Sequence, residues 1–207
     1  MSDRAGILAS VRSALGRAQG APVPPPPASI VTSPAPADLR ARFCDRVVAI
    51  GGRLTQADVT GPTVAEILRA AQVRTVAVSD APELAPIAAQ LAAAGITIVR
   101  HDAPREQLLA AEAGLTMAQM GIAESGTLVL DAGAERARLA SLLPPLHVCV
   151  LPVQRLIPTL GHALAALPAP LPHAITFISG PSRTADIELQ LVVGVHGPKE
   201  LHVVLVG

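Results

Sequence analysis

Residues 75–99, TVAVSDAPELAPIAAQLAAAGITIV, carry the pattern that decides the fold. Thr75–Val78 is a short apolar run of the kind found in buried strands, and Glu83–Ala94 has the composition of a helix that Gly95 would end. Ile96–Val99 is a second apolar run of strand length. Alternation of helices with continuously apolar strands is typical of a parallel sheet that is covered on both faces.

The same alternation extends in both directions from this stretch. The sequence therefore predicts an α/β fold with a mostly parallel sheet covered by helices. Further helices are expected over Asp38–Ile50, Val64–Gln72 and Pro104–Ala113, and further strands over Leu115–Ala118, Thr127–Leu130, His147–Leu151, Ile175–Ile178 and His202–Val206.

The N-terminal part of the chain has a different character. Residues 1–17 place Ile7, Leu8, Val11 and Leu15 at the spacing of an amphipathic helix. Residues 18–37 are rich in proline, which removes backbone donors and favours an extended spacer. We therefore expect an N-terminal helix, a Pro-rich linker and one α/β domain over residues 38–207.

Composition excludes several classes of protein. The chain has 207 residues, no net charge, two Phe and no Trp or Tyr, so neither a basic surface nor an aromatic platform for nucleic acid is expected. Cys44 and Cys149 are too few and too far apart for a disulfide framework or an iron–sulfur site. There is neither a signal-peptide pattern nor an apolar run long enough to span a membrane, so a cytoplasmic protein is expected.

Two polar turns are candidate sites. Glu124-Ser125-Gly126-Thr127 precedes an apolar strand, where hydroxyls and backbone N–H groups suit an anion and Glu124 could act as base or nucleophile. The same residues could instead satisfy local backbone groups of an ordinary turn. No metal site is expected from either turn.

The second turn begins at Gly180 and follows an apolar run, as polar turns do at the carboxyl ends of buried strands in open α/β sheets. Arg183 could bind a carboxylate or phosphate, or pair with acidic residues nearby, while Thr184 could cap a helix that begins near Asp186. His196, in a later glycine-flanked turn, could exchange protons near neutral pH.

Other histidines are weaker candidates. His147 and Cys149 would share one strand face, but without a third ligand at useful spacing they are interpreted as buried core residues. His101-Asp102 follows a strand and is a further candidate.

Three stretches resemble one known family. GIAESGTLVL (121–130), GPSRTADIELQLVVGVHGP (180–198) and ELHVVLVG (200–207) resemble the lactate utilization protein C (LutC/YkgG) family of LUD-domain proteins. The resemblance covers roughly Asp38–Gly207, and its second stretch is long and specific. It implies a NagB/RpiA/CoA-transferase-like fold and a role in oxidising L-lactate to pyruvate beside two partner proteins with iron–sulfur motifs.

The resemblance also makes this chain the component without clusters, so we expect no cofactor here and iron–sulfur clusters in the partner subunits. The residues that match the family's motifs are the candidate site residues. They are Glu124 and His196 as catalytic candidates, and Ser125, Gly126, Thr127, Ser182, Arg183, Thr184, Asp186 and Glu188 as candidates for substrate binding.

Three functions are compatible with these residues. In the first, the chain is a subunit of an L-lactate oxidation complex in which Arg183 clamps a small carboxylate, Ser125 and Thr127 donate hydrogen bonds, and His196 or Glu124 handles a proton. In the second, it is a stand-alone acyl/CoA-transferase-like or sugar-phosphate-acting enzyme with Glu124 as nucleophile. In the third, it is a regulatory module that binds a metabolite without turnover.

Overall fold

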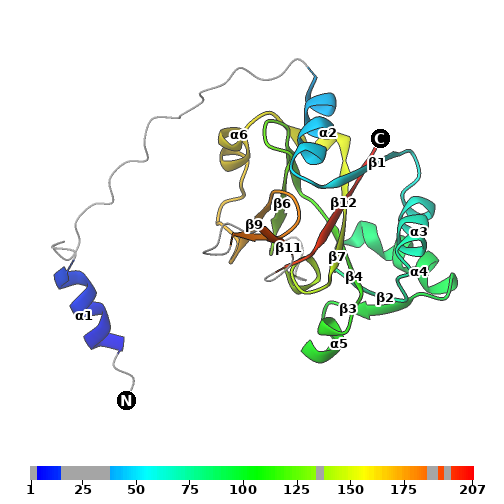
Figure 1. Ribbon diagram of the computed structural model, residues 1–207. Helices are drawn as coiled ribbons and strands as arrows, with labels where there is room; N and C mark the ends of the chain where they lie inside the picture. Colours follow the sequence, from blue (N-terminus) through cyan, green and yellow to red (C-terminus); the bar gives the residue numbers. More distant parts are fainter. Residues whose placement is uncertain (1–3, 15–37, 134–137, 186–190, 194–196) are drawn as a thin grey trace. The chain divides into compact units, whose positions relative to one another are not determined.

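The computed structural model of the chain describes residues 4–14, 38–133, 138–185, 191–193 and 197–207 (Figure 1). The chain divides into two units, Met1–Ile30 and Val31–Gly207. The first unit contains α1 (Arg4–Ala14), a helix with no buried residue. This helix lies within the range 1–17 in which an N-terminal helix is expected, whereas the predicted Pro-rich linker lies outside the described residues.

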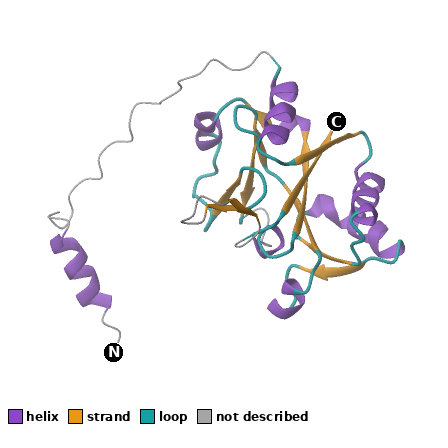
Figure 2. Cartoon of the chain, in the orientation of Figure 1, coloured by secondary structure: helices purple, strands orange, loops and turns teal. Residues whose placement is uncertain are grey.

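The second unit is built on a six-stranded sheet whose neighbouring strands are all parallel (Figure 2). This confirms the predicted α/β class. In spatial order the strands are β1 (Arg53–Ala57), β12 (Glu200–Val206), β7 (Leu146–Pro152), β4 (Ala113–Met117), β2 (Thr75–Val78) and β3 (Thr97–Arg100).

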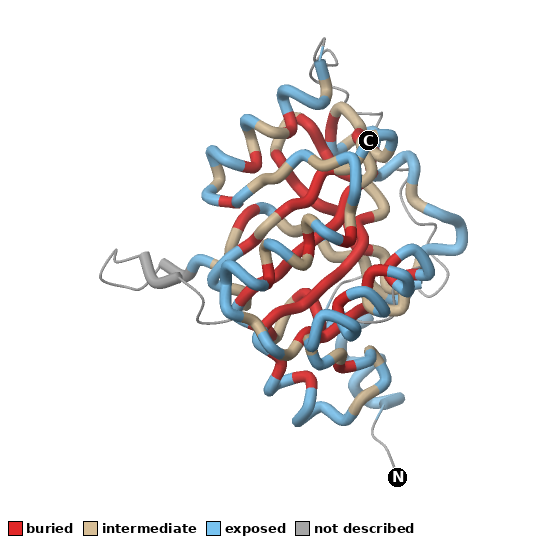
Figure 3. Tube along the Cα trace, turned by 90° about the vertical axis from the view of Figure 1, so that its right-hand side faces the viewer, coloured by how far each residue is buried: buried red, intermediate tan, exposed pale blue. Residues whose placement is uncertain are grey.

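Two helices cover one face of this sheet. The helices α3 (Thr60–Ala70) and α4 (Ala85–Ala93), the latter preceded by the 3-10 turn η1 (Pro82–Leu84), pack their apolar side chains on it. Alternate residues of the strands face these helices, and the resulting core is entirely buried (Figure 3). Its sheet side chains include Val76, Val78, Leu115, Val148, Val150 and Val204.

The other face has two separate covers. The helix α2 (Leu39–Ala49) lies over β7 and β12, where Phe43 and Val47 are fully buried. The short helix α5 (Arg105–Leu109) and the 3-10 turn η2 (Arg138–Ser141) pack over β2, β3 and β4. The two covers leave the amino ends of β7 and β12 between them.

A second sheet of four strands lies beside α2 and corrects the sequence-based assignment. The predicted strands 127–130 and 175–178 exist, but their place in the parallel sheet is wrong because both pair antiparallel in this second sheet. The turn before Thr127 spans only four residues, and a connection this short can join only antiparallel strands. The sheet order is β8 (Leu156–Ile157), β5 (Met120–Ile122), β6 (Thr127–Asp131) and β9 (Ile175–Ile178).

The remaining elements are short. The 3-10 turn η3 (Val153–Arg155) precedes β8, and helix α6 (Leu160–Ala165) follows it. Strand β10 (Arg183–Ala185) forms an antiparallel hairpin with β11 (Leu191–Val193). The helix predicted to begin near Asp186 falls outside the described residues, and Thr184 lies within a strand.

Local capping explains most of the element boundaries. The Asp38 carboxylate accepts a hydrogen bond from the Ala41 N–H at 2.9 Å, which confirms the predicted start of α2. The predicted helix 104–113 is longer than the observed α5, which ends at Leu109. The Glu112 carboxylate accepts a hydrogen bond from the Thr75 N–H at 3.0 Å, directly before β4 starts at Ala113. In the described part of the chain, no helix combines the length and apolar character that crossing a membrane requires.

Two glycine turns pack directly on α2. Gly126 has a φ of +69°, and a Cβ there would lie 2.7 Å from the Val47 backbone nitrogen. Gly180 has a φ of +79°, and a Cβ there would lie 2.6 Å from the Ile50 carbonyl oxygen at the end of the helix. Only glycine permits both the left-handed backbone and this close approach. The two sequence motifs therefore meet on one helix.

We predict that Gly126→Ala destabilises the domain more than Gly95→Ala. Both glycines have positive φ, but Gly95 has nothing within 4 Å of an added Cβ, so it reports the backbone cost alone. That cost is about 1 kcal/mol, and the clash of Gly126 with α2 adds about 1–3 kcal/mol. Urea unfolding followed by circular dichroism measures both. Equal losses in the two variants would contradict the close packing of Gly126.

Candidate functional site

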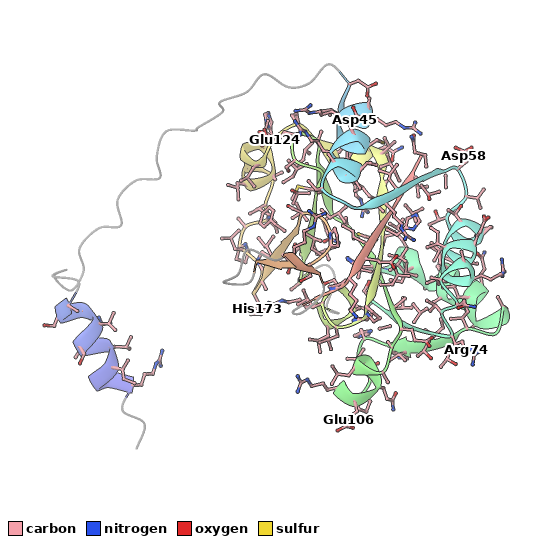
Figure 4. The ribbon with its side chains drawn as sticks, in the orientation of Figure 1. Asp45, Asp58, Arg74, Glu106, Glu124 and His173 are labelled. Atoms are coloured by element: carbon pink, nitrogen blue, oxygen red, sulfur yellow. The ribbon has the colours of Figure 1, made fainter. Side chains whose placement is uncertain are left out.

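The first motif places its charged residue on a helix end. The Glu124 carboxylate accepts a hydrogen bond from the Leu160 N–H at 2.9 Å, at the start of α6 (Figure 4). Thr159 caps the same helix and accepts from the His162 N–H. A carboxylate at this position complements the partial positive charge of the helix N-terminus. The geometry thus gives Glu124 a capping contact, and its catalytic role stays a prediction.

The hydroxyls of the first motif connect it to the second. Ser125 Oγ lies 2.7 Å from Thr127 Oγ1, which in turn lies 2.7 Å from Ser179 Oγ. Ser179 directly precedes the Gly180 turn, and it is not among the site residues predicted from the sequence. Antiparallel pairing of β6 with β9 brings the three side chains together. A chain of hydroxyls therefore runs from the first motif to the second.

The second motif is held by the end of α2. Arg183 is exposed, and its Nη2 donates to the Ile50 carbonyl oxygen at 3.0 Å. This carbonyl belongs to the helix C-terminus, whose partial negative charge favours a cation. The Ser182 N–H donates to the Pro198 carbonyl at 2.9 Å, which joins the turn to the approach of β12. Arg183 and Ser182 are thus fixed from two sides.

A cavity of about 300 Å³ opens at this turn, and we call it the seam cavity because it lies where the two covers of the sheet face leave a gap. His147 and Leu201 are the second residues of β7 and β12, so the cavity lies at the amino ends of these parallel strands. The expectation of a site at the carboxyl end of a buried strand is not met, since β9 is only partly buried and antiparallel. The lining residues are Ser141, Leu142, His147, 176–183, Gly197, Pro198 and Leu201.

His147 is the unexpected member of the cavity wall. Its imidazole is fully buried, and its Nε2 lies 2.8 Å from Thr116 Oγ1 on β4. Its Nδ1 is buried and has no hydrogen-bond partner among the described residues. Burial lowers the pKa of the His147 imidazole to about 4, so the ring is neutral at physiological pH. The sequence-based interpretation as a buried residue is confirmed, but it gave no sign of the unpaired nitrogen.

The remaining candidates are only partly placed. The backbone of Thr184 pairs with Val192 in the hairpin of β10 and β11. Asp186, Glu188 and His196 lie outside the described residues, so their positions relative to the seam cavity are not assigned. Gly126 packs on α2 and does not line the cavity.

Metal-binding side chains do not cluster within the described ranges. No group of three or more His, Cys, Asp or Glu residues there could hold an ion. Cys44, on α2, and Cys149, on β7, form no disulfide, and they belong to or pack against the same apolar core. Burial is the main cause that raises the pKa of the Cys44 thiol.

His101 and Asp102 are adjacent in sequence but have different partners. Asp102 pairs with Arg100 at 3.1 Å, whereas His101 Nε2 lies 4.0 Å from Asp80 Oδ2. Asp80 follows β2 and His101 follows β3, so the carboxyl ends of adjacent parallel strands bring them together. They border a cavity of about 390 Å³ at the opposite end of the sheet from the seam cavity.

Comparison with known proteins decides the family. The sequence profile of the LUD domain matches residues 64–206. This chain belongs to the LUD domain family. A relative from Deinococcus radiodurans, lactate utilization protein C, is 32% identical over 97% of this chain and 94% of its own length. The protein of the same name from Halalkalibacterium halodurans is 47% identical over 42% of this chain, and the alignment covers 41% of that relative, less than half its length.

A solved structure shares the fold of this LUD domain. The crystal structure of a DUF162 family protein from Deinococcus radiodurans superposes with a TM-score of 0.64 at 29% sequence identity. The superposition covers 82% of this chain and 96% of that one. The predicted family and fold class are thereby confirmed.

We predict that His147 makes the LUD domain sensitive to mild acid. Its pKa is about 4 when folded and 6.5 when unfolded, so between these values the unfolded chain binds the proton more tightly. The contribution of His147 to the free energy of unfolding is therefore fully present above pH 6.5, and about 3 kcal/mol of it is lost as the pH falls toward 4.

Urea unfolding at a series of pH values, for the wild type and for His147→Gln, measures this contribution. The difference between the two stability curves should change over the stated range and level off above it. His173→Gln, which replaces an exposed histidine (Figure 4), tests whether loss of any histidine has the same effect. Parallel curves for the wild type and His147→Gln would contradict the assignment.

Proposed function

We propose that this LUD domain protein takes part in lactate utilization, as the non-cluster component of an L-lactate-oxidising complex whose seam cavity binds a small carboxylate. The observation that carries the proposal is Arg183, together with Ser182 and Ser179, on the wall of the seam cavity. The relative that aligns over most of this chain is named lactate utilization protein C, and this name supports a role in lactate utilization.

Arg183 supplies the charge that an anion needs. A guanidinium has five N–H donors in a planar fork that matches a carboxylate, and the contact with Ile50 uses one nitrogen, Nη2. Because that contact fixes the side chain, less conformational entropy is lost when an anion binds. Ser182 adds a hydroxyl on the same wall. The carboxylate is therefore assigned to the Ser182–Arg183 end of the cavity.

The size of the cavity favours a small acid. Pockets for drug-sized ligands range from about 300 to 1,000 Å³, and the seam cavity, at about 300 Å³, lies at the lower limit. Ser179 also lines it, whereas Ser125 and Thr127 act through the hydroxyl chain that ends at Ser179. In this proposal those two residues position Ser179, and His196 or Glu124 remains the candidate for handling a proton.

Electron transfer is assigned to the partners. Oxidation of a hydroxy acid requires a redox group that accepts two electrons. This chain has two cysteines, Cys44 and Cys149, whereas a typical iron–sulfur cluster needs four thiolates. The proposal therefore gives substrate binding to this chain and the iron–sulfur clusters to partner subunits in the cytoplasm.

The partner assignment is tested by an anaerobic, detergent-free pull-down of this protein from lactate-grown native cells. Mass spectrometry identifies the co-eluting proteins, and visible absorbance detects iron–sulfur clusters. A brown eluate with cluster-bearing partners is expected. A colourless eluate with this protein alone would overturn the complex.

We predict that Arg183→Ala weakens L-lactate binding by about ten- to hundredfold, because a charged hydrogen bond contributes about 1.5–3 kcal/mol. The matched control is Arg53→Ala. Arg53 is an exposed arginine on the edge strand β1 that pairs with Glu200 and does not line the cavity. Isothermal titration with sodium L-lactate measures binding, and lactate oxidation by the reconstituted complex measures function. Unchanged binding and oxidation in Arg183→Ala would exclude the clamp.

A further inference from the structure

We propose that His147 is a specificity-determining residue, whose Nδ1–H recognises the C2 oxygen of a 2-oxo or 2-hydroxy acid held in the seam cavity. This inference rests on the proposed carboxylate pocket and names the class of acid that the pocket selects. It assigns a role to a histidine that the sequence motifs do not include.

The first step is the position of the imidazole. His147 lines the cavity, while Thr116, the residue that occupies Nε2, does not. The ring is therefore held from the sheet side by Thr116, and we infer that its Nδ1 edge faces the cavity. Buried polar atoms in proteins are nearly always hydrogen-bonded, so an unpaired Nδ1 beside a cavity indicates that a further group binds there.

The second step is the location of the proton on the ring. Thr116 is itself buried, and among the described residues its hydroxyl bonds His147 only. If Nε2–H donated to Thr116, the buried threonine O–H would lack an acceptor and Nδ1 would lack a donor. If Thr116 donates to Nε2, only Nδ1–H is unpaired, which costs less free energy. The neutral ring therefore carries its hydrogen on Nδ1 and offers a donor.

The third step is the match between the donors and a ligand. Arg183 and Ser182 can donate from the Gly180 turn in the lining, and the Nδ1–H of His147 donates from the start of β7 in the same lining. A monocarboxylate with a second oxygen on the adjacent carbon presents acceptors to both. Propionate has the same carbon skeleton as pyruvate and lactate but lacks that oxygen, so it would leave Nδ1–H unpaired. A site with a buried polar group discriminates against the analogue that cannot pair with it.

The final step concerns access. No part of the His147 side chain is exposed to solvent, so a ligand reaches Nδ1 only after the surrounding wall shifts. Leu201, the strand partner of His147, and Leu142 are apolar residues of this wall. Their displacement exposes apolar surface, which only the acid that then pairs with Nδ1–H offsets. An acid that cannot pair with Nδ1–H has no need to open the wall, so the cost of opening is subtracted from the gain of the hydrogen bond. The discrimination between acids is therefore that of about one net hydrogen bond.

The test uses the full chain labelled with ¹⁵N-histidine, titrated separately with sodium pyruvate, sodium L-lactate and sodium propionate. The His147 resonances are assigned by their loss in His147→Phe. We expect the hydrogen on Nδ1 in the free chain, a shift of the Nδ1 resonance with pyruvate and L-lactate, and none with propionate. Isothermal titration should show propionate binding about tenfold more weakly than pyruvate, the contribution of about one hydrogen bond.

His147→Phe should bind pyruvate as weakly as propionate, with propionate affinity unchanged. If this variant fails to fold, loss of the resonances in His147→Gln gives the assignment, and the spectra of the unmodified chain decide the outcome. Equal binding of all three acids with an unmoved Nδ1 resonance would overturn the role of His147 and leave the carboxylate pocket intact. Binding of none of them would overturn the pocket and this inference together. A hydrogen on Nε2 instead of Nδ1 would overturn the donor assignment.

Discussion

Packing of α2 against two glycine turns is the contact on which the rest of the domain depends. Phe43 and Val47 bury the inner side of the helix in the core beside β7 and β12. Gly126 approaches its backbone, and Gly180 approaches its last carbonyl. Because both turns touch one rigid helix, two motifs more than fifty residues apart in sequence hold a fixed separation. The hydroxyl chain and Arg183 inherit their positions from it.

The seam cavity follows from the way the sheet is covered. One face is covered by two packed helices, but the other is shared between α2 with the second sheet and the short elements α5 and η2. Two independent covers cannot close over the amino ends of β7 and β12 as completely as one continuous layer. A polar residue, His147, lies at that position, where an apolar side chain would ordinarily stabilise a sheet. A buried nitrogen without a partner has a cost in stability, which the proposed ligand would offset on binding.

Sequence reasoning succeeded where the signal was local. The apolar runs identified β2, β3, β7 and β12, and Asp38 marked the start of α2. It failed for β1, whose residues Arg53–Ala57 are largely polar because the strand lies at the edge of the sheet. It also placed β6 and β9 in the wrong sheet, because an apolar run does not reveal its partner strand. The short turn before Thr127 was the available signal.

The sequence by itself determined the α/β class, the family motifs and most strands, because periodicity and turn chemistry act between near neighbours. Only the tertiary structure decided which side chains share a site. It joined Ser179 to Ser125, turned Glu124 to cap α6, gave His101 the neighbour Asp80, and bound Arg183 to Ile50. It also left His147 Nδ1 unpaired beside a cavity. Such contacts depend on how distant segments pack, and no local pattern encodes that arrangement.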